Sequence, residues 1–189
     1  QSSSRWFARG ALVTAAVEQG EWWRLVTAAT LHSDLDHALS NAAFLIVLAW
    51  AAAEHVGVGL AALAWLMTAV AGFGASLALT DIVRTVGASG GLFGLLGVAA
   101  AAAAKRVPRP YVVDPPRQRL RVIASAILLV AFTAFSPHVN IMAHVVGFVA
   151  GLGMGLVVAS SPALGPWWQA SAAMVTAVLV AVAWAAALA

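Results

Sequence analysis

The residues with the clearest chemical potential are a serine set among glycines and a histidine in a second apolar segment. Ser89 lies in the stretch Gly87-Ala88-Ser89-Gly90-Gly91-Leu92-Phe93-Gly94, at the start of an apolar run. Glycines beside a serine let the backbone turn sharply and let another chain approach, which favours a presented hydroxyl and hence a nucleophile. Small residues also pack membrane helices together, so the motif taken alone is more typical of helix packing.

His144 gives the serine a possible base. Glycines follow both residues at four-residue spacing: Gly147, Gly151 and Gly155 after His144, and Gly90 and Gly94 after Ser89. Residues four apart share a helix face, so we expect two glycine faces to pack and to bring Ser89 and His144 within hydrogen-bond reach. A serine with a histidine base is the minimum equipment for acyl transfer. Alone, His144 could equally be a buried histidine bonded to a carbonyl, or a proton relay in a transporter.

A third group of polar residues begins the first apolar segment. His37 and Asn41 are four apart, so they share one face, and both side chains donate hydrogen bonds. Beside a nucleophile, these donors and the Ser89 backbone N–H, at the positive end of a helix, would stabilise an oxyanion.

Two other interpretations of this group remain open. It could simply be a helix start capped by Asp36 or Ser33. A metal site through His32 and His37 is disfavoured, because residues five apart share a helix face poorly and no carboxylate is placed to complete the shell. We therefore expect no metal and no cofactor.

The composition places the elements around these residues in a membrane. Hydrophobic residues make up 62% of the chain and charged residues 9%, and the mean hydropathy is +0.93, which is typical of polytopic membrane proteins. The chain has no cysteine, and six of its ten basic residues lie between Lys105 and Arg121. Such clustering is a topology signal rather than a nucleic-acid surface, and it predicts that the 105–121 loop is cytoplasmic.

The apolar pattern predicts an all-α bundle of six spanning helices after an interfacial segment, residues 1–36, rich in tryptophan. The third span is short: its 16 residues extend about 24 Å, against about 30 Å of hydrocarbon. Ser89 should therefore lie below the surface in a water-filled cavity open to the extracytoplasmic side. The expected spans are 37–53, 57–80, 89–104, 122–135, 140–159 and 167–189.

Four motifs carry a family resemblance. They are Glu21-Trp22-Trp23-Arg24, His32 to His37 to Asn41, Gly87-Ala88-Ser89-Gly90, and Ala143-His144-Val145-Val146-Gly147. Their order and separations resemble those of rhomboid intramembrane serine proteases, over about residues 21–155. The resemblance implies a Ser89–His144 dyad without an acidic third member, and an oxyanion hole made by His37, Asn41 and the Ser89 N–H.

The resemblance also implies supporting roles. Glu21 and Arg24 match a structural pair in the first outer loop, and His32 matches a position linked to holding water near the dyad. Phe93 matches an aromatic that stacks on the histidine. Gly87, Gly90 and Gly147 complete the motifs, the turn at 136–139 matches a cap over the site, and the fourth span matches the side of substrate entry.

We therefore expect a rhomboid core over residues 1–159 and an additional C-terminal helix over 160–189 with no catalytic role. No spanning helix precedes Trp22, so the usual first core helix is expected to be missing. The expected function is hydrolysis of peptide bonds in transmembrane substrates, in a lipid environment such as a bacterial plasma membrane. An inactive relative that binds membrane helices and a proton-relay transporter are the alternatives, and the sequence carries no signal for oligomeric state.

Overall fold

Five long apolar helices form the body of the molecule in the computed structural model, which describes residues 4–81, 83–104, 120, 123–124, 139–160 and 164–189. These helices are α4 (Leu35–Val56), α5 (Val58–Leu79), α6 (Ser89–Ala104), α8 (Ile141–Ala159) and α9 (Pro166–Leu188). They match five of the six expected spans within a few residues. Except for residues 120 and 123–124, the expected fourth span and the 105–121 loop lie outside the described residues, as do residues 136–138 of the cap.

Helix α6 lies at the centre of the bundle. It is apolar all round, and most of its residues are buried, as expected for a helix enclosed by others. It packs against α4, α5 and α8, and its contact with α8 is the most extensive between any two described elements. Four of the long helices are long and apolar enough to cross a membrane, whereas α6 is shorter.

Each helix boundary has a local cause. The side chain of Asp34 accepts a hydrogen bond from the His37 N–H and caps α4, whereas Asn140 does the same for α8 through the Ala143 N–H. Gly57, at φ +86°, makes the tight connection between α4 and α5. The first residue of α9 is a proline, which is favoured there because its missing N–H has no helical partner.

Short elements are gathered at one end of the bundle. They are α1 (Arg5–Gly10), β1 (Leu12–Val13), α2 (Thr14–Glu18), α3 (Arg24–Thr27) and the 3₁₀ helix η1 (Ala28–Thr30). Strand β1 pairs antiparallel with β2 (Arg84–Thr85), with Leu12 opposite Thr85. The N-terminal segment is thereby attached to the loop before Ser89, a contact that the sequence analysis did not predict.

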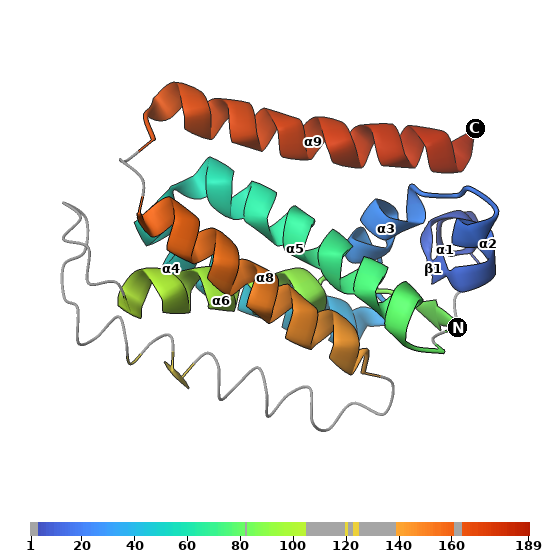
Figure 1. The fold of residues 1–189 in the computed structure, drawn as a ribbon. Coiled ribbons are helices and arrows are strands. Elements are labelled where there is room, and N and C mark those ends of the chain that lie inside the picture. The colour runs from blue at the N-terminus through green and yellow to red at the C-terminus, as the bar shows by residue number, and fades with distance from the viewer. Residues whose placement is uncertain (1–3, 82, 105–119, 121–122, 125–138, 161–163) are drawn as a thin grey trace.

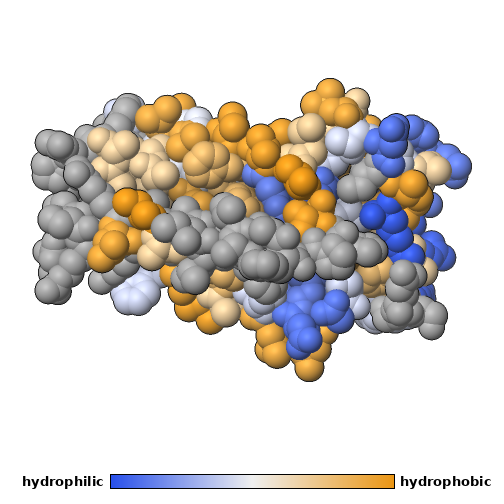
Figure 2. All heavy atoms as spheres, turned by 90° about the horizontal axis from the view of Figure 1, so that it is seen from below, coloured by the Kyte–Doolittle hydropathy of each residue, from blue (hydrophilic) through white to orange (hydrophobic). Residues whose placement is uncertain are grey.

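Helix α9 lies alongside α5 and reaches the short N-terminal elements with its C-terminal end (Figure 1). The chain therefore has both of its described ends at the same end of the bundle. Hydrophilic residues gather toward the end that carries the N-terminal elements, and hydrophobic residues make up most of the coloured surface elsewhere on this face (Figure 2). This distribution is the one expected of a chain that crosses a bilayer.

Candidate active site

Ser89 and His144 form a direct hydrogen bond between helices α6 and α8. The distance between Ser89 Oγ and His144 Nε2 is 2.7 Å, so the contact predicted from the glycine spacing is present. Ser89 is the first residue of α6 and is partly exposed, whereas His144 is only 7% exposed. A hydroxyl within reach of an imidazole nitrogen is the arrangement that a serine nucleophile requires.

The glycine faces explain how two helices bring these side chains together. A β-carbon on Gly147 would overlap the carbonyl oxygen of Gly90, and one on Gly151 would overlap that of Gly94. The helices therefore approach until backbone meets backbone, which any side chain at these positions would prevent. The same packing fixes the position of His144 along the helix axis relative to Ser89.

Phe93 orients the imidazole. Its ring is stacked on the ring of His144, with a centroid distance of 4.4 Å and an angle of 20° between the planes. Phe93 lies one turn after Ser89 on α6, so one helix supplies both the hydroxyl and the surface against which the histidine rests. The stack restricts rotation of the ring, a task that an aspartate performs in a three-residue triad.

His37 faces the serine across Gly87. A β-carbon on Gly87 would lie 3.1 Å from His37 Nε2 and 3.8 Å from Ser89 Oγ, so both groups border the space left by the absent side chain. The backbone of Gly87 has φ +134°, which side-chain-bearing residues rarely adopt. The His37 ring therefore borders one side of this space and the Ser89 hydroxyl the other.

Asn41 is buried on α4, one turn after His37. Its side-chain nitrogen donates a hydrogen bond to the His37 carbonyl at 2.8 Å, and the residue is 4% exposed. An asparagine amide has a second N–H that this bond does not use. Asn41 therefore keeps a donor available on the face of α4 that it shares with His37.

The helix cap differs from the alternatives considered for the sequence. Asp34, rather than Asp36 or Ser33, caps α4, because its extended backbone directs Oδ1 to the His37 N–H at 2.8 Å. Ser33 instead donates its hydroxyl to Asp34 at 2.7 Å and lies 3.1 Å from His37 Nδ1. Capping uses only the backbone N–H of His37, so it leaves the ring Nε2 of this residue free of the cap.

His32 lies beside His37, and the two rings meet edge to face at a centroid distance of 5.1 Å. Burial lowers the pKa of His32 from its ordinary value, nearby His37 lowers it further, and Asp34 acts in the opposite direction. Its Nε2 atom is buried and has no hydrogen-bond partner among the described residues. Within the same described residues, no three histidine, cysteine or acidic side chains are grouped as a metal site would require.

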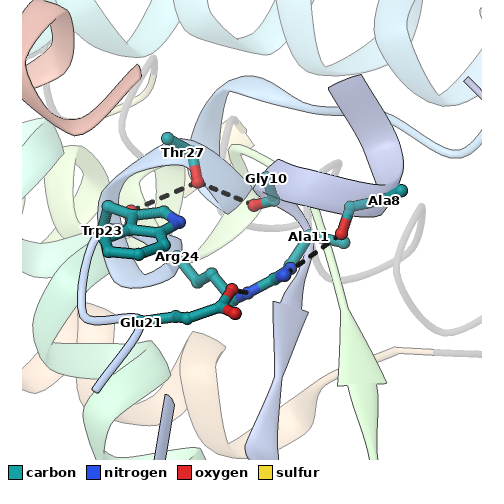
Figure 3. Close-up of polar contacts among 7 residues, drawn as sticks. All are labelled: Ala8, Gly10, Ala11, Glu21, Trp23, Arg24 and Thr27. Atoms are coloured by element: carbon teal, nitrogen blue, oxygen red, sulfur yellow. Dashed lines mark hydrogen bonds and ion pairs between the residues drawn. The ribbon is translucent and has the colours of Figure 1, made fainter. Parts of the chain in front are cut away.

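Glu21 and Arg24 form the pair that the resemblance implied, and Arg24 reaches further. Its guanidinium donates to Glu21 at 2.6 Å, to the Ala11 carbonyl at 2.6 Å and to the Ala8 carbonyl at 3.1 Å (Figure 3). The Arg24 side chain is buried, and these bonds connect α3 to α1 and to Ala11, the residue between α1 and β1. The pair therefore fixes the fold of the N-terminal segment.

Two contacts near the site were missed by sequence reasoning. The Gly87 N–H donates to the Ala28 carbonyl of η1 at 2.9 Å, and the Ser76 hydroxyl of α5 donates to Asn140 Oδ1 at 2.9 Å. The first involves only backbone atoms, for which a sequence has no signal. The second had one, because Ser76 and Asn140 are polar residues at the ends of apolar segments.

Together these features define a polytopic helical membrane protein with a serine–histidine pair at one end of its spanning helices. The Rhomboid domain family model matches residues 19–161, and the chain belongs to the rhomboid family. It is 33% identical to RHOMBOID-like protein 5 of Arabidopsis thaliana over 162 residues, which are 82% of this chain and 50% of that protein. It is therefore an integral membrane protein.

Other relatives extend the comparison. RHOMBOID-like protein 1 of Arabidopsis thaliana is 32% identical over 82% of this chain and 40% of its own length. Rhomboid protease GluP of Bacillus subtilis is 36% identical over 48% of this chain and 18% of its own length. The chain thus spans half or less of the length of these relatives, and the family to which it belongs includes proteins named as proteases.

Proposed function

We propose that this chain is an intramembrane serine endopeptidase that hydrolyses peptide bonds in or near transmembrane segments of other proteins. The observation that carries the proposal is the 2.7 Å contact between Ser89 Oγ and His144 Nε2, on an imidazole stacked against Phe93. In this role His144 Nε2 accepts the serine proton, so the ring proton resides on Nδ1. No cofactor takes part in the proposed chemistry.

The reaction follows from the positions of these groups. Ser89 Oγ attacks the carbonyl carbon of the substrate while His144 takes its proton, and the tetrahedral oxyanion is stabilised by His37, Asn41 and the Ser89 N–H. His144 then returns the proton to the leaving amine, which breaks the C–N bond and leaves an acyl-enzyme. A water molecule, deprotonated by His144, hydrolyses this ester and restores Ser89.

The placement of the site indicates the class of substrate. Ser89 lies at the start of a helix that is shorter than the bilayer core, next to apolar helices, so a substrate reaches it from the lipid or just above it. A helical peptide bond is shielded by its own hydrogen bonds, so the substrate segment must unwind before attack. Membrane-spanning segments that contain small or helix-breaking residues near the Ser89 end of the bilayer fit this requirement.

The proposal is tested by labelling the purified protein with a fluorophosphonate, which reacts with activated serines. Wild type should be labelled, and Ser89→Ala should abolish labelling. His144→Ala should reduce its rate by about 100-fold or more, because the hydroxyl loses its base. Ser160→Ala, at the opposite end of α8, is the matched control and should label as wild type does.

Two outcomes would contradict the proposal. Labelling that survives Ser89→Ala would place the reactive serine elsewhere. A folded wild type that is not labelled and does not cleave a single-span reporter in liposomes would favour the inactive, helix-binding alternative.

We also propose that the Ser89 end faces the extracytoplasmic side of a bacterial plasma membrane, with residues 1–159 as the protease core and 160–189 as an added helix. Orientation is measurable because the chain has no cysteine of its own. Gln19→Cys lies at the Ser89 end and Leu164→Cys precedes α9 at the other end, and both positions are exposed. An impermeant maleimide added to intact cells should label only Gln19→Cys, and the reverse result would invert the topology.

A further inference from the structure

Helix α9 makes a specific polar contact with the segment that supports the loop before Ser89. The indole Nε1 of Trp184 donates a hydrogen bond to Thr30 Oγ1 at 3.1 Å. Thr30 is the last residue of η1, and Trp184 lies near the C-terminal end of α9, 154 residues further along the chain. The indole is partly buried, and an indole N–H in apolar surroundings is stabilised by an acceptor, so this contact favours one docking position for the end of α9.

The docking position of Trp184 is shaped on its other sides as well. A β-carbon on Gly10 would lie 2.5 Å from Trp184 Cη2, so only glycine leaves room for the ring there. The ring of Trp6 meets that of Trp184 edge to face at 5.2 Å. The indole therefore contacts both α1 and η1.

From Thr30 the contacts continue to the loop that precedes Ser89. The Thr30 hydroxyl accepts the indole N–H and donates its own proton to the Thr27 carbonyl at 2.8 Å. Two residues before Thr30, the Ala28 carbonyl accepts the Gly87 N–H at 2.9 Å. One three-residue helix thus connects Trp184 on α9 with Gly87, two residues before Ser89.

The opposite end of α9 is tied to the bundle independently. The Gln169 side chain donates to the Val56 carbonyl at 2.8 Å and accepts the Leu60 N–H at 3.1 Å, so it bridges the turn between α4 and α5. Gly59 packs directly against the Gln169 backbone. Because both ends of α9 are held by hydrogen bonds, the position of Trp184 is fixed relative to the helices that carry Ser89 and His144.

We propose that Trp184 is a positioning residue for the nucleophile. Its bond to Thr30 holds η1 in place, and η1 in turn holds the backbone of Gly87 and thereby the position of Ser89, two residues later. This inference rests on the proposed function only for its activity readout. It gives α9, which lies outside the matched 19–161 region, a role in the chemistry. The role is indirect, because Trp184 acts through Thr30 and the backbone of η1.

The test combines a physical and a chemical measurement on the full chain. Trp184→Phe keeps an aromatic ring but loses the N–H donor, and Thr30→Val keeps the shape but loses the acceptor. Both should increase amide hydrogen exchange in a peptide covering Gly87. Both should also slow fluorophosphonate labelling of Ser89 by about fivefold, as a small displacement of a reacting group does.

Three controls separate positioning from general stability. Thr30→Ser restores the hydroxyl and should restore both the exchange and the labelling rates. Trp168→Phe, at an indole that is 64% exposed at the start of α9, should match wild type. The double variant Trp184→Phe/Thr30→Val should be no slower than either single variant, because the two changes remove one shared interaction. In a cleavage assay, Trp184→Phe and Thr30→Val should lower kcat and leave KM unchanged.

Unchanged exchange at Gly87 in Trp184→Phe would overturn the proposal. So would a general increase in exchange along α9 with normal labelling, which would show that the contact only stabilises the fold. If wild type is not labelled at all, the proposed protease function fails, while exchange at Gly87 still decides whether α9 holds this loop.

Discussion

At the scale of single residues, Gly87 has two properties that depend on its lack of a side chain. Its φ of +134° is strained for any other residue. The missing β-carbon also leaves the space between His37 and Ser89 open, since that atom would lie 3.0 Å from His37 Cε1. The residue thus shapes both the backbone before Ser89 and the space between His37 and Ser89.

Gly87→Ala should therefore abolish labelling of Ser89 by a fluorophosphonate. The backbone strain costs about 1–3 kcal/mol, and the added methyl group meets the His37 ring. Gly20→Ala is the matched control, because Gly20 has φ +99° with nothing within 4 Å of the added carbon. That variant should lose a similar amount of thermal stability but keep its labelling rate. Equal labelling of the two variants would show that the space at Gly87 is not part of the site.

Asp34 predicts a dependence of stability on pH. The His37 backbone N–H, and then the Ser33 hydroxyl, lower the pKa of Asp34 below its ordinary value of 3.8. The carboxylate therefore stabilises the folded state above the unfolded pKa, and this contribution is lost as the pH falls through the folded pKa. Asp34→Asn keeps an oxygen acceptor that does not titrate. The advantage of wild type over Asp34→Asn in thermal unfolding should shrink from about pH 6 to about pH 3, and parallel curves would exclude this linkage.

The sequence predicted the Ser89–His144 contact because glycines and polar residues are unusual enough in apolar helices to mark a shared face. It did not identify Asp34 as the cap, since Ser33, Asp34 and Asp36 are all capable caps and only the backbone angles decide among them. It also could not show that Gly87 bonds to Ala28, because every residue except proline carries the same backbone groups.

At the scale of elements, α8 offers a direct comparison of two glycines on one helix. Gly151 packs against the Gly94 carbonyl of α6, whereas Gly153 has nothing within 4 Å of its missing β-carbon. Gly151 therefore belongs to the glycine face that packs against α6, and Gly153 does not.

Gly151→Ala should lower the free energy of unfolding by about 1–3 kcal/mol, because the methyl group pushes α8 away from α6. Gly153→Ala should be neutral or stabilise by up to about 1 kcal/mol, through better helix propensity alone. Because the displaced helix carries His144, Gly151→Ala should also slow labelling of Ser89. Thermal unfolding in detergent and labelling rates measure both effects, and equal behaviour of the two variants would contradict the packing model.

Element boundaries were predictable where the apolar pattern is long. The short third span was expected at 89–104, and α6 covers Ser89–Ala104. The β1–β2 pair was not expected, since two residues per strand are too few to show an alternating pattern. Short elements of this kind form only because the surrounding fold brings them together.

At the scale of the whole molecule, the N-terminal segment is held in shape by one buried cation. Arg24 is 6% exposed, and its three hydrogen bonds reach Ala8 in α1, Ala11 directly after α1, and Glu21. The same segment contains η1, which bonds to the loop before Ser89. The fold of a segment that lies outside the membrane-spanning helices therefore bears on the site.

Arg24→Lys should test this dependence without removing the positive charge. An ammonium group is a single point, so it cannot reach Glu21, Ala8 and Ala11 together, and at least one carbonyl loses a charged partner. The expected loss in the free energy of unfolding is about 2 kcal/mol, with increased hydrogen exchange across residues 8–30. Arg9→Lys, at an exposed position in α1, is the matched control and should change neither quantity. If Arg24→Lys leaves exchange over 8–30 and at Gly87 as in wild type, the guanidinium fork does not organise this segment, and the segment must be held by its apolar contacts alone.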